Sequence, residues 1–244
     1  MNAWRNPRNA LALLLGLFGG LLVARALGAH PLDPLPALSF APPPPGSYIL
    51  HRIMPAPDGQ VLGIDGRSRP LSQYTRGQMT LLGFIYTTCV DPEGCPLAYR
   101  VFEAFKKAIA ATPALTGKVR FVTLSFDPAR DTPDVMRRYA GSRAVDMSGD
   151  LRWYFLTTRS VRELMPLVEG FGQDVRVTYD RSSGRARREL SHVLKVFLID
   201  RAGDVREIYS SQFLHPQTVL NDIETLLMEE SLRSSRASVT KNTR

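Results

Sequence analysis

The residues best suited to chemistry in this 244-residue chain are Cys89 and Cys95, the only two cysteines in the sequence. Five residues lie between them, Val90 to Gly94. Two neighbouring thiolates can bind a soft metal ion, or they can cycle between a dithiol and a disulfide. The pair can also be purely structural, as buried apolar side chains or as a disulfide that closes a short loop and adds modest stability. The elements around the pair bear on this choice.

An apolar run from Met79 to Tyr86 leads into the cysteines, and a helical pattern from Pro96 to Ala111 follows them. The run predicts a strand buried on both faces. A proline directly after Cys95 fits the first helical position, where no backbone N–H is needed. Both sulfurs then lie near a helix N-terminus, where the N–H groups and the helix dipole favour thiolate over thiol. This setting favours a reactive pair over a structural one.

A soft-metal site with two sulfurs usually takes a histidine as its next ligand, and the sequence has four histidines. His30 lies in the N-terminal region, His51 in a strand-like entry segment, and His215 before a proline that opens a helix. His192 immediately precedes an apolar strand, Val193 to Ile199, so its imidazole can face the same end of the sheet as the cysteine loop. A single histidine is more often structural than a ligand, so the pattern alone leaves the choice open.

The rest of the pattern alternates between strands and helices. Strands are expected at residues 60–64, 79–86, 119–126, 151–156, 193–199 and 205–209, and helices at 96–111, from Thr132, from Ser160 and at 216–228. The first strand continues through an Asp-Gly turn into a short hairpin, and the last two strands form an antiparallel hairpin. This order predicts an α/β fold, a thioredoxin-like sandwich with a central mixed β-sheet flanked by helices and an added N-terminal hairpin.

The two ends of the chain differ in composition from the middle. Residues 1–29 carry Arg5 and Arg8 before a short apolar stretch and then small residues, which predicts a signal peptide or an N-terminal membrane anchor. Residues 30–46 predict a proline-rich linker, residues 47–232 one folded domain, and residues 233–244 a basic, flexible tail. The expected location is the bacterial periplasm, with the protein tethered to the inner membrane or released by cleavage, in preference to the mitochondrial intermembrane space.

The formal net charge of +8 does not indicate a nucleic-acid-binding protein. Several of the basic residues belong to the leader and to the C-terminal tail. The other arginines are scattered and form no basic stripe interleaved with aromatic residues. We therefore expect no nucleic-acid partner and a membrane contact only through the N-terminal segment.

Several motifs occur in an order that resembles one family. They are Tyr86-Thr87-Thr88-Cys89 with Cys95-Pro96, Asp127-Pro128-Ala129-Arg130-Asp131-Thr132-Pro133, Trp153 with Phe155-Leu156-Thr157, and Ser191-His192 before Phe197-Leu198-Ile199-Asp200. Together they are similar to the Sco/SenC family of copper-binding, thioredoxin-like proteins, over roughly residues 47–228. The resemblance implies Cys89, Cys95 and His192 as copper ligands and Asp127 as a supporting acidic residue near the metal.

The resemblance also implies a function. We expect a copper metallochaperone that holds one Cu(I), with Cu(II) as a second state, and delivers it to the copper centre of a respiratory oxidase or a related copper enzyme. Further expected partners are another copper chaperone and a thiol reductant. The family's usual loop has three residues between the cysteines, whereas this chain has five. The longer loop puts Asp91 and Glu93 beside the sulfurs, where negative charge opposes thiolate formation.

Two other functions use the same cysteines. A thiol–disulfide reductase that keeps the recipient's cysteines reduced would need Cys89 and Cys95 but not His192. On that hypothesis the protein is an enzyme, whereas a metallochaperone is not. A thiol peroxidase fits poorly, because Tyr86 stands where that class has a threonine three residues before its reactive cysteine.

Overall fold

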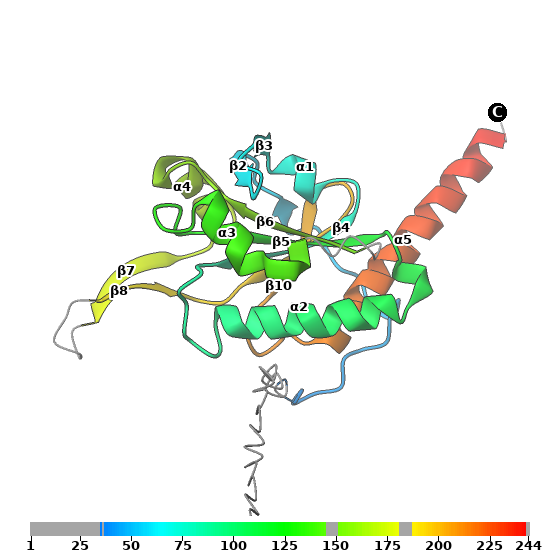
Figure 1. Ribbon diagram of the computed structural model, residues 1–244. Coiled ribbons are helices and arrows are strands. Elements are labelled where there is room, and N and C mark those ends of the chain that lie inside the picture. Colours follow the sequence, from blue (N-terminus) through cyan, green and yellow to red (C-terminus); the bar gives the residue numbers. More distant parts are fainter. Residues whose placement is uncertain (1–34, 36, 145–150, 181–186, 243–244) are drawn as a thin grey trace, which may run out of the picture. The chain divides into compact units, whose positions relative to one another are not determined.

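A mixed sheet of eight strands forms the centre of the structure (Figure 1). The computed structural model describes residues 35, 37–144, 151–180 and 187–242. The strands of this sheet are β1 (Met54–Pro55), β2 (Gln60–Gly63), β3 (Ser68–Pro70), β4 (Met79–Ile85), β5 (Val119–Ser125), β6 (Arg152–Thr157), β9 (Val196–Ile199) and β10 (Asp204–Tyr209). They lie in the order β1-β10-β9-β4-β5-β6-β2-β3. Strands β4, β5 and β6 are parallel, and the other pairings are antiparallel.

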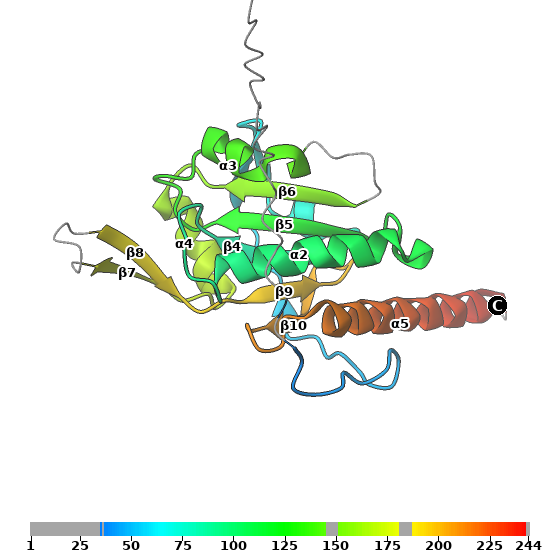
Figure 2. The same ribbon diagram turned by 60° about the horizontal axis from the view of Figure 1, so that its bottom comes forward.

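Helices cover both faces of the sheet. They are α1 (Ser72–Thr75), α2 (Cys95–Ala110), α3 (Pro133–Ala140), α4 (Val161–Gly170) and α5 (Pro216–Asn242), with short 3₁₀ turns η1 (Pro113–Leu115) and η2 (Gly141–Ala144). Buried side chains of α2, α3 and α5 belong to one apolar cluster, and those of α1 and α4 belong to a second. Figure 2 shows α2 and α5 crossing the same face. This is the sandwich with a mixed sheet that the sequence predicts.

The central strands are apolar throughout because they are buried on both faces. Every residue of β4 and of β5 is buried. Within β4, Leu81 packs into the cluster under α2, whereas its neighbour Leu82 packs into the cluster under α4. Alternation of side chains between the two faces of a strand explains why a continuous apolar run was the correct signal here.

Two helix starts follow the capping signals in the sequence. The Thr132 hydroxyl accepts a hydrogen bond from the N–H of Val135 at 3.4 Å, and the Ser160 hydroxyl accepts one from the N–H of Glu163 at 3.3 Å. Pro133 occupies the first turn of α3, where its missing N–H costs nothing. These caps begin α3 and α4 where the sequence predicts.

Two strands form a separate sheet that the sequence analysis did not predict. Strands β7 (Val175–Asp180) and β8 (Arg187–His192) pair antiparallel in a hairpin that extends from the main sheet (Figures 1 and 2). His192 therefore ends β8, and the next strand begins only at Val196. The added hairpin expected near the N-terminus is present as β2 and β3.

The ends of the folded unit differ from the sequence-based expectation. Helix α5 continues past Met228 to Asn242, so residues 233–242 are helical where an irregular tail was expected. Part of the proline-rich segment packs on this helix. The Asn221 side chain donates a hydrogen bond to the carbonyl of Pro43 at 2.8 Å, and the N–H of Gly46 donates to the Thr225 hydroxyl at 2.9 Å.

The expected signal peptide or anchor, residues 1–29, lies outside the described residues. Within the part of the chain that the structure describes, no helix combines the length and the apolar character needed to span a membrane.

Candidate metal centre

The cysteine loop begins where β4 ends and closes where α2 begins. Cys95 is the first residue of α2 and is buried, whereas Cys89 lies in the loop and is half-buried. The extra length of the loop is taken up by a turn. The N–H of Gly94 donates to the carbonyl of Asp91 at 3.0 Å, and the N–H of Glu93 donates to the Asp91 carboxylate at 3.1 Å. This turn allows five intervening residues without separating the two sulfurs.

His192 reaches the cysteine loop from the opposite direction along the sheet. Strand β9 runs antiparallel to β4, and Val196 at its start pairs with Gly83 near the end of β4. The residues just before Val196 therefore lie at the same sheet edge as the cysteine loop. The His192 ring is held there between aromatic neighbours, with its centroid 5.8 Å from that of Tyr86 and 4.8 Å from that of Phe126.

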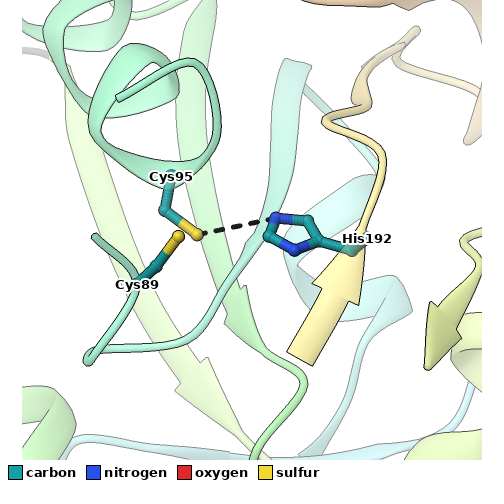
Figure 3. A group of neighbouring side chains, drawn as sticks. All are labelled: Cys89, Cys95 and His192. Carbon is teal, nitrogen blue, oxygen red and sulfur yellow. Dashed lines mark hydrogen bonds between the residues drawn. The ribbon is translucent and has the colours of Figure 1, made fainter. Parts of the chain in front are cut away.

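The two sulfurs and the imidazole converge on one point (Figure 3). One ligand atom from each of Cys89, Cys95 and His192 lies within 4.8 Å of the other two. The Sγ of Cys95 is 3.8 Å from the Nε2 of His192. Two sulfurs and one nitrogen form a donor set that suits a soft ion such as Cu(I).

The hydrogen bonding of His192 leaves the nitrogen that faces the sulfurs free to bind. Its Nδ1 lies 3.2 Å from the carbonyl oxygen of Leu190. Because a carbonyl can only accept, Nδ1 must carry the proton in this contact. In the neutral ring, Nε2 then presents its lone pair to the sulfurs, the arrangement common in metal-binding histidines.

The two thiols are not equivalent. A hydrogen bond from the Cys95 thiol lowers the pKa of Cys89, and backbone N–H groups of Cys95 and Asp91 also favour the Cys89 thiolate. The same contact raises the pKa of Cys95, and its burial and the negative charge on Cys89 act in the same direction. The pair therefore shares one proton, and Cys89 is the thiol that ionises first. Asp91 contributes a backbone N–H to the thiolate as well as the negative side chain noted in the sequence.

Asp127 and Asp131 lie in the same loop after β5 but have different contacts. Asp127 is 2% exposed, and its carboxylate is 3.6 Å from the guanidinium of Arg130. Asp131 is 1% exposed and accepts hydrogen bonds from the N–H of Thr87 at 3.0 Å and from the Thr87 hydroxyl at 2.5 Å. Its carboxylate also accepts one from the Ser125 hydroxyl at 2.6 Å. Asp131 thus connects the β5 loop to the cysteine loop.

The family resemblance implies Asp127 as the supporting residue, whereas Asp131 occurs in the sequence only as a member of the same motif. Two carboxylates four residues apart in one loop gave no signal for which of them faces the cysteines. Asp127 remains a predicted supporting residue, and Asp131 contacts Thr87 of the cysteine loop.

The other histidines have different surroundings. His51 is exposed, and the Nδ1 of His215 accepts a hydrogen bond from the N–H of Gln217 at 3.2 Å, next to the start of α5. His30 lies outside the described residues. Among the histidines that the structure describes, only His192 joins the two cysteines in a group that could hold a metal ion.

A thioredoxin-like fold with two thiols and an imidazole at the edge of its sheet defines a class of proteins that handle soft metals or thiols. Residues 64–228 match the family model SCO1/SenC, and the chain belongs to this family. No curated protein sequence matches the chain in a direct comparison.

Solved structures of family members have the same fold. Arabidopsis thaliana ScoI with copper bound is 18% identical at a TM-score of 0.59, and the match covers 71% of this chain and 98% of that chain. Apo Sco1 from Thermus thermophilus is 25% identical at a TM-score of 0.55, with 74% and 95% covered. BsSco, a member of the Sco family of cytochrome c oxidase assembly proteins, is 21% identical at a TM-score of 0.54, with 72% and 96% covered.

Proposed function

We propose that this protein is a copper metallochaperone that binds one copper ion through the Cys89 and Cys95 sulfurs and the Nε2 of His192. The observation that carries the proposal is the convergence of these three donor atoms within 4.8 Å. Thiolate sulfur suits Cu(I), and imidazole accommodates both Cu(I) and Cu(II). A. thaliana ScoI has been solved with copper bound, which supports copper as the ion.

The proposed recipient is the copper centre of a respiratory oxidase or a related copper enzyme. BsSco belongs to a family of cytochrome c oxidase assembly proteins, and this is the support for such a recipient. The proposed location is outside the cytoplasm, in the bacterial periplasm. The basic and apolar leader supports export, and a SCO1/SenC family member from Bacillus anthracis is a lipoprotein.

A second candidate function is reduction of the recipient's copper-ligand cysteines. The specific observation that favours it is the difference in exposure of the two thiols, because Cys89 is half-buried whereas Cys95 is buried. An accessible thiolate beside a buried thiol is the arrangement that thiol–disulfide exchange requires. A disulfide switch is described for BsSco.

Transfer to an isolated copper-receiving oxidase domain separates the two functions. The purified protein, loaded anaerobically with one Cu(I), is mixed with the metal-free domain, and copper is measured in each protein after separation. The proposal expects copper to move to the domain, with little loading or transfer for His192→Ala. In a parallel assay, the reduced, copper-free protein is mixed with the disulfide form of the domain. The second function would replace the first if the parent transfers no copper but reduces the disulfide. In that case His192→Ala should still reduce the disulfide, and Cys89→Ser should not.

A further inference from the structure

A pocket of about 270 Å³ opens beside the two cysteines, and the basic residue Arg143 is part of its lining. Cys89 and Cys95 form part of its lining, and Tyr99, Tyr139 and Arg143 form another part. Tyr99 is one helical turn after Cys95 on α2, and Arg143 lies in the turn η2 after α3. No aspartate or glutamate lines this pocket, as far as the structure describes the chain.

Arg143 is held in position by contacts with Tyr99 and Tyr139. Its guanidinium lies over the Tyr99 ring, 4.5 Å from the centroid. One nitrogen donates to the Tyr99 hydroxyl at 2.5 Å, and another donates to the backbone carbonyl of Tyr139. Its Nε is buried and has no hydrogen-bond partner. Among the described residues, no carboxylate forms an ion pair with Arg143.

Tyr139 adds a neutral donor to the same pocket. Burial raises the pKa of the Tyr139 hydroxyl to about 12, and negative charge on Cys95 and Cys89 acts in the same direction. The hydroxyl therefore keeps its proton at neutral pH and can donate a hydrogen bond to an anion. An arginine with a neighbouring hydroxyl donor is a combination that recognises carboxylates.

We propose that this pocket binds a small peptide-like thiol by its carboxylate, with Arg143 and Tyr139 holding the carboxylate while the thiol sulfur reacts at Cys89. The reaction is reduction of a Cys89–Cys95 disulfide. The incoming thiolate attacks the Cys89 sulfur, because Cys89 is half-buried whereas Cys95 is 2% exposed. The Cys89–Cys95 bond breaks, and Cys95 leaves with the electron pair and takes up a proton.

A second thiolate completes the reaction. It attacks the sulfur of the small thiol in the mixed disulfide, and Cys89 leaves as a thiolate. Two thiols are oxidised to one disulfide, and one protein disulfide is reduced to two thiols. The pocket would thus return the protein to the reduced form in which the proposed function requires it. The inference uses the same cysteines as that function, but its test requires no copper.

The test compares two reductants that differ only in their carboxylates. The oxidised, copper-free protein is mixed with glutathione or with glutathione diethyl ester, and free cysteines are counted over time by alkylation and mass spectrometry. The quantity of interest is the ratio of the second-order rate constant with glutathione to that with the ester. We expect this ratio to fall about tenfold in Arg143→Gln, the size expected for loss of a charge-assisted hydrogen bond. Arg138→Gln, which removes an exposed charge from α3, is the matched control and should leave the ratio unchanged.

Two further variants guard against a folding defect. Tyr139→Phe keeps the ring and removes only the hydroxyl, and it should lower the ratio by about threefold. Arg143→Lys keeps the charge and should retain part of the preference. The proposal is overturned if Arg143→Gln and Arg138→Gln give the same ratio, or if the parent protein reacts with both reductants at the same rate. Neither of these two results would bear on copper binding, because the assay contains no copper. Conversely, a parent protein that binds no copper could still show the preference for glutathione over its ester.

Discussion

The Sγ of Cys95 and the Nε2 of His192 lie 3.8 Å apart, although the two residues are 97 positions apart in the sequence. Cys95 begins α2, and His192 ends β8 just before β9. The contact exists because β9 pairs antiparallel with β4, which places the start of β9 beside the end of β4. The donor set is therefore a product of strand order, and it requires the folded sheet.

The shared proton of the cysteine pair predicts an unusual reactivity for Cys89. The hydrogen bond from the Cys95 thiol, together with the backbone N–H groups of Cys95 and Asp91, lowers the pKa of Cys89 to about 5. Because the thiolate is the nucleophile, the alkylation rate rises as pH passes the pKa. We expect Cys89 in the reduced, metal-free protein to react with iodoacetamide at a rate that is already near its plateau at pH 6.5. The measurement is the rate of single alkylation between pH 4 and pH 9.

Cys95→Ala provides the comparison for this reactivity, because it removes the thiol donor and leaves the backbone N–H groups in place. The midpoint of the pH profile should then move upward, toward that of an ordinary thiol. A parent profile with its midpoint near pH 8.5, the usual range for a free thiol, would contradict the inequality of the two sulfurs.

Asp131 should influence the metal site without binding the metal. In Asp131→Asn, at least one of the three donors from Thr87 and Ser125 loses its oxygen acceptor and faces an amide NH₂ group instead. A buried donor left unsatisfied costs about 1–3 kcal/mol. We expect a lower denaturation midpoint and a copper affinity reduced by about tenfold, as is usual for residues that orient metal ligands.

Asp134→Asn is the matched control for Asp131→Asn. Asp134 lies three residues further along the chain, and its side chain is 70% exposed. Unfolding midpoints and copper affinities that are the same in the two variants would show that Asp131 does not orient the cysteine loop.

A buried ion-pair cluster on the other side of the fold should contribute strongly to stability. The Arg206 side chain is 7% exposed and pairs with Asp200 at 2.9 Å and with Glu229 at 2.8 Å. It also donates to the backbone carbonyl of Leu50. Arg206→Ala leaves the buried Asp200 carboxylate without its ion-pair partner, whereas Glu229 keeps Arg233, so we expect the free energy of unfolding to fall by about 3–5 kcal/mol. Urea denaturation followed by circular dichroism measures it.

Arg52→Ala is the control for this cluster. Arg52 pairs with Asp204 at 2.8 Å, but its side chain is 60% exposed. A pair this accessible to solvent contributes about 0–1 kcal/mol. If the two arginine variants have equal effects, burial is not what makes the Arg206 cluster important.

Much of the fold could be predicted because its signals are local. The apolar run of β4, the proline after Cys95, and the caps at Thr132 and Ser160 each specify their own element. The strand pattern put His192 at the sheet edge of the cysteine loop but left the choice among the histidines open, and the resemblance to the family indicated His192.

The features that were missed depend on contacts between distant segments. The β7–β8 hairpin carries charged residues among its apolar ones, and Leu190 is buried whereas Arg176 and Val177 are exposed, so its described residues give only a weak burial signal. The choice between Asp127 and Asp131 depends on how one loop turns. The position of Arg143 over Tyr99 depends on where the turn η2 lies relative to α2, which no local pattern specifies.

The most direct test of the account is Cu(I) binding by the reduced protein in competition with a chromophoric Cu(I) chelator. Cys89→Ser, Cys95→Ser and His192→Ala are compared with His51→Ala, which removes an exposed histidine away from the site. We predict one copper ion per chain, an affinity about 100-fold lower or worse in each of the three site variants, and no change in His51→Ala. If His192→Ala binds copper as tightly as the parent, or if the parent binds none, the three residues do not form a copper site.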